Sequence, residues 1–146
     1  MVLDKKGLAL IKTFEGFKAK PYICPAGIPT IGYGTTRYEG GRHVTMKDAP
    51  ISEERASDIL KHQVDSHYGA AVDRYVQIDI NQNQFDALVS FAYNLGIGAL
   101  KSSTLLQQVN RGRSPADEFG KWIHANGKIL SGLVRRREAE RNLYLA

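Results

Sequence analysis

Cysteine is almost absent: Cys24 is the single thiol in a chain of 146 residues. A lone cysteine cannot form an internal disulfide, so the sequence excludes a disulfide-stapled scaffold and fits a reducing compartment. No apolar run approaches the ~20 residues that span a membrane. The chain opens with charged residues at positions 4 to 6 instead of the apolar segment of a signal peptide. We therefore expect a protein that is made in the cytoplasm and stays there until another factor releases it.

Motifs for metal and nucleotide binding are missing as well. The sequence contains no HExxH or CxxC, no P-loop and no dinucleotide-binding fingerprint. His62 and His67 are five positions apart on a predicted helix, so they do not face each other well. We expect neither a metal nor a cofactor.

Basic residues, in contrast, outnumber acidic residues. The formal net charge is +5, which suits a polyanion such as nucleic acid or the phosphate-rich bacterial envelope. An excess of solvated lysine and arginine explains it equally well. The run VRRREAER spreads three arginines around a predicted helix and interleaves Glu138 and Glu140 with them. We expect mostly a solvated, salt-bridged helix there and no nucleic-acid partner, with wall binding or one buried arginine as alternatives.

The order of predicted elements indicates an α+β protein. Residues 4 to 14 form a helix with Asp4 as its N-cap, and Gly16 ends it. Residues 17 to 45 form a small antiparallel sheet from the runs YIC, PTIGYG and HVT, with turns at glycines 27, 32 and 34. The chain is helical from Ser52 onward. A cleft between the two parts is the default location of a site.

The helical part divides at its capping signals. Asn81 and Gln84 form a capping box before FDALVSFAYNL, which ends at Gly96. Further helices are expected over residues 100 to 110, from Ser114-Pro115 through Ile123, and over residues 132 to 144.

Three residues near the first helix could carry chemistry. Glu15 lies beside two phenylalanines at a helix C-terminus, and both features favour a protonated carboxyl group. Chemistry alone nevertheless favours a glutamate paired with an arginine. Cys24 fits a buried small residue, a nucleophile with a histidine partner, or a substitute for a second carboxylate. Thr30 could orient a water or merely suit a strand.

The segment EGFKAKPYICPAGIPTIGYGTT resembles the catalytic hairpin of phage-type lysozymes, the endolysins of glycoside hydrolase family 24. That family has Glu, eight residues, Asp or sometimes Cys, five residues, and Thr, which Glu15, Cys24 and Thr30 match without a gap. The resemblance continues through NQNQFDALVSFAYNLGIGAL, SSTLLQQVNRG, the Trp122 region and GLVRRREAERNLYL. It covers essentially the whole chain.

The resemblance implies one lysozyme-like domain over residues 1 to 146. It has a β-rich lobe at about 15 to 50, a helical lobe at about 51 to 146 with helix 4 to 14 packed on it, and the active-site cleft between them. The implied substrate is peptidoglycan, cut at the β-1,4 bond from N-acetylmuramic acid to N-acetylglucosamine. Glu15 is then the general acid, Cys24 occupies the base or nucleophile position, and Thr30 positions water. Tyr93 and Asn94 match glycan-contacting positions, and Arg136 packs toward the catalytic helix.

The role of the thiol stays open between base, nucleophile and neutral water-positioning group, and we favour an inverting reaction. A lytic transglycosylase, which needs only one acid, and a non-catalytic peptidoglycan-binding module are the alternative functions. As an endolysin, the protein is expected to be a monomer without stable membrane insertion. It would collect in the host cytoplasm, depend on a holin for access, and then act on the cell wall from the periplasm.

Overall fold

The first helix, α1 (Lys5–Glu15), begins and ends where the sequence predicts. The computed structural model describes residues 1–146. The Asp4 carboxylate accepts hydrogen bonds from the backbone N–H groups of Lys6 and Gly7, as an N-cap does. Gly16, with a φ of 72°, closes the other end. Glu15 is therefore the last helical residue and faces the segment that follows.

The small lobe is built on two antiparallel strands, β1 (Lys18–Ile23) and β2 (Pro29–Gly32). Gly27, Gly32 and Gly34 all have positive φ, which confirms the turns expected there. The prediction of a third strand at HVT is wrong. Of these residues only His43 takes part in pairing, in an isolated bridge with Arg37. A side chain organises this loop instead: the Asp48 carboxylate accepts hydrogen bonds from Tyr38 and Thr45.

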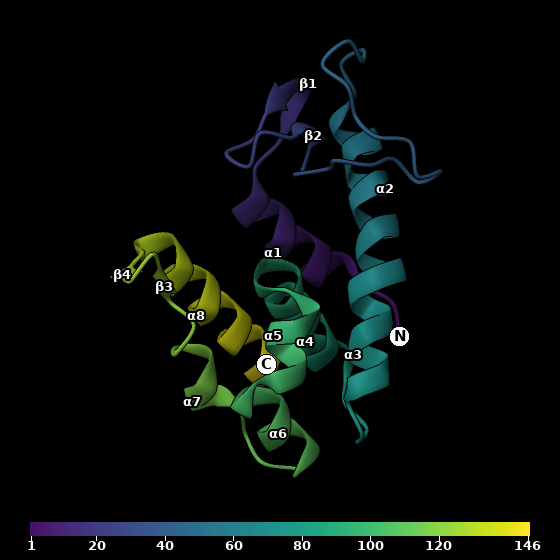
Figure 1. Cartoon of the computed structure of the whole chain (residues 1–146). Helices are drawn as coiled ribbons and strands as arrows, with labels where there is room; N and C mark the ends of the chain where they lie inside the picture. Colours follow the sequence, from purple (N-terminus) through teal and green to yellow (C-terminus); the bar gives the residue numbers. More distant parts are fainter.

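A long helical segment connects the small lobe to the rest of the molecule. Ser52 caps α2 (Glu53–Gln63), which continues through a π-helical stretch, η1 (Val64–Gly69), into α3 (Ala70–Tyr75). Figure 1 shows α2 beside the small sheet at one end and α3 beside the helical lobe at the other. This segment therefore belongs to both lobes.

The centre of the helical lobe is α4 (Gln82–Leu95), which opens with the predicted capping box. Every residue from Phe85 to Ala92 is buried. The helix packs against α1, α8, α5 and η1, so it holds the core of the molecule.

The remaining elements differ from prediction in two places. The helix expected over residues 100 to 110 is two helices, α5 (Ile97–Ser102) and α6 (Thr104–Asn110), because Ser103 caps the second with its own hydroxyl. The helix expected from Ser114 is the single turn α7 (Ala116–Phe119), so Trp122 lies outside it. A hairpin of β3 (His124–Ala125) and β4 (Lys128–Ile129) follows, and α8 (Ser131–Leu145) ends the chain.

The result is the α+β architecture predicted from the sequence, with a small β-containing lobe and a larger helical lobe (Figure 1). Among its helices, none is both long and apolar enough to cross a bilayer.

Candidate active site

Glu15 lies where the two lobes meet. Its Oε2 accepts a hydrogen bond from Arg136 Nη1 of α8 at 2.7 Å. The Glu15 side chain keeps 24% of its surface exposed, whereas the Arg136 side chain keeps 4%. The carboxylate is thus held on one oxygen by a buried guanidinium and remains open to solvent. Both the arginine pairing that chemistry favours and the approach of Arg136 toward α1 are confirmed.

Two of the three adjacent arginines in VRRREAER belong to a buried network, which corrects the expectation of a mostly solvated helix, while Arg135 and Glu138 are exposed. Arg136, Arg137 and Glu140 are all buried. Glu140 lies within ion-pair distance of both arginines, at 3.4 Å and 2.8 Å, and Ser90 of α4 donates to its Oε2. Burial raises the pKa of Glu140 and lowers that of Arg137. The sequence could not show this, because the side chains that bury these charges come from α4.

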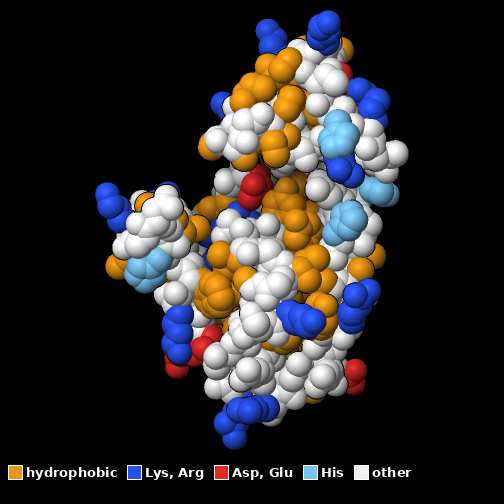
Figure 2. Space-filling model, in the orientation of Figure 1, with side chains coloured by type: hydrophobic (Ala, Val, Ile, Leu, Met, Phe, Trp, Pro, Cys, Tyr) orange, Lys and Arg blue, Asp and Glu red, His pale blue; other side chains and the backbone are white.

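Asn94 is fixed by the same network. Its Oδ1 accepts a hydrogen bond from Arg137 Nη2 at 2.6 Å. Asn94 also lines a pocket of ≈ 730 Å³ beside Glu15. The other walls of this pocket come from the end of α1 and the start of α8, namely Thr13, Phe14, Leu130, Ser131, Gly132, Leu133, Arg135 and Arg136. Figure 2 shows the molecule hollowed between its lobes, with an acidic side chain in the hollow.

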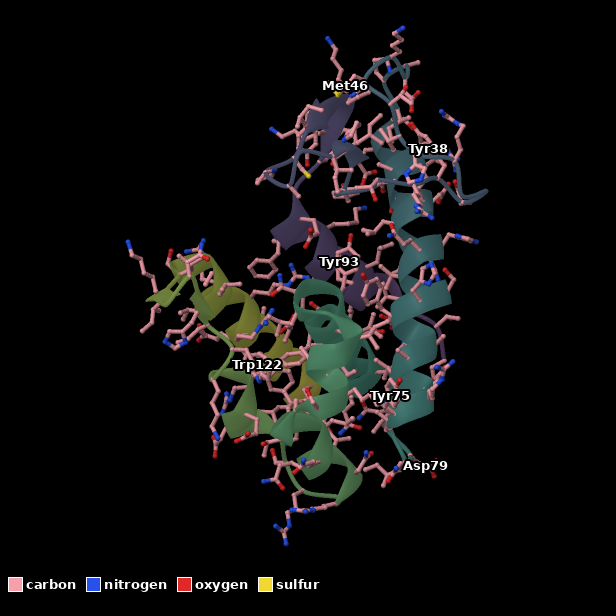
Figure 3. All side chains as sticks on the ribbon, viewed as in Figure 1. Tyr38, Met46, Tyr75, Asp79, Tyr93 and Trp122 are labelled. Atoms are coloured by element: carbon pink, nitrogen blue, oxygen red, sulfur yellow. The ribbon has the colours of Figure 1, made fainter.

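Tyr93 and the turn after β2 bring the lobes together around the second oxygen of Glu15. The Tyr93 hydroxyl donates a hydrogen bond to the carbonyl of Tyr33 at 3.3 Å. The rings of Tyr68 and Tyr93 pack edge to face, with their centroids 5.1 Å apart. A Cβ atom at Gly34 would lie 3.6 Å from Glu15 Oε1 and 3.8 Å from Tyr93 Oη. Burial, followed by the charge of Glu15, raises the pKa of Tyr93, so its hydroxyl stays protonated. Figure 3 shows Tyr93 at the end of α4 that faces the small lobe.

Cys24 and Thr30 lie together on the β1–β2 hairpin. The Cys24 backbone N–H donates to the Ile28 carbonyl at 3.1 Å, which closes the turn. Thr30 is buried and donates its own hydroxyl to the Ile28 carbonyl at 2.8 Å. The Ile28 backbone, and then the Thr30 hydroxyl, lower the pKa of the Cys24 thiol. Cys24 is partly exposed, so the interpretation as a buried small residue is wrong.

The described side chains include groups suited to acid–base chemistry. One lobe presents a carboxyl group on a rigid helix end, and the hairpin of the other presents a thiol with a lowered pKa beside a hydroxyl. No three His, Cys, Asp or Glu side chains in the chain converge to hold a metal ion.

Sequence reasoning missed the β3–β4 hairpin that precedes the pocket-lining start of α8. Its signal was available: Asn126-Gly127 is a typical two-residue hairpin turn, and both residues have positive φ.

Comparisons with known proteins find relatives over nearly the whole chain. The family model described as phage lysozyme matches residues 12–140. The endolysin of Bacillus phage B103 is 46% identical over 147 residues, covering 99% of this chain and 54% of that protein. The endolysin of Salmonella phage P22 is 36% identical over 148 residues, covering 100% of this chain and 99% of that protein. The chain thus spans about half the length of the first relative and nearly all of the second.

Solved structures show the same architecture. The endolysin from Escherichia coli O157:H7 phage FAHEc1 superposes with a TM-score of 0.88 at 40% identity, covering 99% of this chain and 94% of that one.

Proposed function

Because the chain belongs to the phage lysozyme family, we propose that it is an endolysin that hydrolyses bacterial peptidoglycan. The bond cut is the β-1,4 link between N-acetylmuramic acid and N-acetylglucosamine. One observation carries this proposal: Glu15 ends a rigid helix in the hollow between the lobes, with Oε2 bound by Arg136 and Oε1 facing the gap at Gly34. A neutral glycan needs such a positioned acid, because its leaving oxygen must be protonated.

In the proposed reaction, Glu15 gives its proton to the departing glycosidic oxygen. The bond from this oxygen to the anomeric carbon then breaks, and the sugar develops oxocarbenium character. Tyr93 stays a neutral hydroxyl, so it adds no charge beside Glu15. Tyr93 and Asn94 line the helical side of the site, where they would contact the glycan.

Cys24 and Thr30 act on the other reactant, water. A lowered pKa gives the Cys24 thiol more thiolate at neutral pH than a free cysteine has. The Thr30 hydroxyl carries two lone pairs, so it can accept a hydrogen bond from water whichever neighbour its own hydrogen points to. We propose that the pair orients the attacking water, whose oxygen bonds to the anomeric carbon on the face opposite the leaving oxygen. The Cys24 thiolate accepts the proton of this water, and the anomeric carbon is inverted. The protein would act in host lysis at phage release, reaching the wall from the host cytoplasm through a holin.

Mass spectrometry of the products from purified peptidoglycan tests these roles. Wild type is compared with Glu15→Gln and Cys24→Ser under identical conditions. We expect hydrated disaccharide products from the wild type, a loss of about 10²–10⁴-fold in rate for Glu15→Gln, and a clear loss for Cys24→Ser. Circular dichroism verifies that each variant is folded.

The products also separate the alternatives. Anhydro ends instead of added water would place the protein with the lytic transglycosylases. Full activity of Cys24→Ser would remove the thiol from the mechanism and leave Glu15 with an ordered water. Binding without release of sugars would identify a non-catalytic wall-binding module.

A further inference from the structure

A second hollow lies in the small lobe, on the side of α2. It has a volume of ≈ 350 Å³ and is enclosed by the loop after β2 and by the exposed face of α2 and η1. Its lining carries three basic side chains, Arg37, His62 and His67. Figure 2 shows histidines gathered along this side of the molecule, with a lysine or arginine side chain among them. We call this hollow the histidine groove.

The basic side chains of the histidine groove make no polar contact with the rest of the protein. Arg37, His62 and His67 are all exposed, and none of their side-chain nitrogens takes part in a hydrogen bond, ion pair or cation–π contact of the chain. The acidic side chain of the lining, Glu39, is already bound by both terminal guanidinium nitrogens of Arg55. The groove therefore presents a permanent guanidinium charge and imidazole donors that make no hydrogen bond within the protein, with the Glu39 carboxylate near enough to His62 for their charges to interact.

Two walls of the histidine groove are continuous along the chain with residues of the candidate active site. On one wall, Thr36 follows two residues after Gly34, which faces Glu15. On the other wall, His67 precedes Tyr68, whose ring packs against Tyr93. A polymer that passes Glu15 between these walls would therefore place its neighbouring unit, and any substituent on it, against the groove.

We propose that the histidine groove binds a carboxylate of the peptide stem that peptidoglycan carries on its muramic acid units. The inference rests on the proposed function, because the glycan backbone itself is uncharged and only its substituents supply an anion. Arg37 offers a planar fork of donors that matches a carboxylate, and the imidazoles of His62 and His67 add N–H groups from the opposite wall. The groove would thereby favour peptide-bearing strands over bare glycan.

The test compares intact peptidoglycan with the same material after its carboxylates have been converted to amides. The groove variant is Arg37→Gln/His62→Gln/His67→Gln. The charge control is Arg111→Gln/Arg113→Gln, which removes exposed positive charges from the loop between α6 and α7. KM and kcat are measured for all three proteins at pH 6, after circular dichroism has shown that each is folded.

Amidation should raise the KM of wild type and of the charge control about tenfold. This is the loss of affinity expected when one charge-assisted hydrogen bond is removed. The groove variant should show this raised KM on both substrates, and kcat should not change. An equal response of all three proteins to amidation would overturn the proposal, as would a groove variant that matches wild type on intact peptidoglycan.

A binding experiment keeps this inference separate from the proposed activity. N-acetylmuramyl-alanyl-glutamate and its amidated counterpart are titrated into isotope-labelled wild type while backbone amide shifts are recorded. If the wild type releases no sugars, the proposed activity fails. Shifts around Arg37, His62 and His67 with the acid alone would still support the groove, and their absence would overturn it.

Discussion

Glu15 owes its position to residues that are far away in the sequence. Arg136, which holds its Oε2, lies 121 positions further along the chain. Gly34 comes close to the other oxygen from the turn after β2, and it does so with a φ of +79° that side chains rarely adopt. The absence of a side chain at position 34 therefore keeps the approach to Glu15 open.

Substituting Gly34 tests this requirement at the level of one residue. Gly34→Ala should lower the free energy of unfolding by about 1 kcal/mol, because alanine is strained at positive φ. Its Cβ would also stand 3.6 Å from Glu15 Oε1 and displace the substrate, so we expect hydrolysis about tenfold slower or worse. Gly40→Ala is the matched control, since Gly40 has no atom within 4 Å of an added Cβ and no positive φ. Equal activities of the two variants would contradict the role of this close approach.

At the scale of elements, α4 and α8 are joined by buried charge as well as by apolar packing. Glu140 lies between Arg136 and Arg137 and accepts a hydrogen bond from Ser90 of α4. Arg137 in turn binds Asn94 near the end of α4. This network sets the position of α8 against α4, and with it the guanidinium that Glu15 needs.

Removing the central carboxylate should be costly because two arginines remain buried beside it. We expect Glu140→Gln to lower the free energy of unfolding by about 3 kcal/mol, measured by urea denaturation. Glu138→Gln changes the same group on the exposed side of the same helix and should stay within about 0.5 kcal/mol of wild type. Similar midpoints for the two variants would mean that the network contributes little to stability.

For the whole molecule, one buried carboxyl group links folding to pH. Asp86 of α4 lies under the first turn of α1, where an added Cβ at Gly7 would be 2.6 Å from its Cγ. Gln82 and the Asp4 backbone N–H both donate to its Oδ1, while Oδ2 has no partner. Burial, and then the neighbouring Asp4, raise the pKa of Asp86 to about 7.

The direction of the pH effect follows from this shift. Folding favours the protonated form of Asp86, so its stabilising effect is complete below pH 4 and is lost as the pH rises through 7. We expect the free energy of unfolding to fall by about 4 kcal/mol between pH 4 and pH 8 on account of this group, because each unit of pKa difference is worth about 1.4 kcal/mol. Asp86→Asn should flatten that part of the curve in thermal unfolding. Asp79→Asn, at the exposed Asp79 labelled in Figure 3, should leave the slope unchanged, and a wild-type slope in Asp86→Asn would contradict the assignment.

Local signals in the sequence determined the ends of the main helices and the composition of the hairpin. Asp4, Gly16, Asn81 and Gln84 act on backbone groups within four residues, so their effects could be predicted without the fold. The spacing of Glu15, Cys24 and Thr30 likewise places an acid at a helix end and a thiol and hydroxyl on one hairpin. The family resemblance rests on these same short segments.

Tertiary structure alone decided which charges are buried and where the histidine groove lies. The sequence of α8 predicts exposed side chains at Arg136, Arg137 and Glu140, because it holds no information about Ser90 and the rest of α4, which cover them. Arg37 and His67 share a groove because the loop after β2 folds onto α2 and η1. Contacts between such distant segments depend on the packing of the whole core, whereas a cap or a turn depends only on its neighbours in the chain.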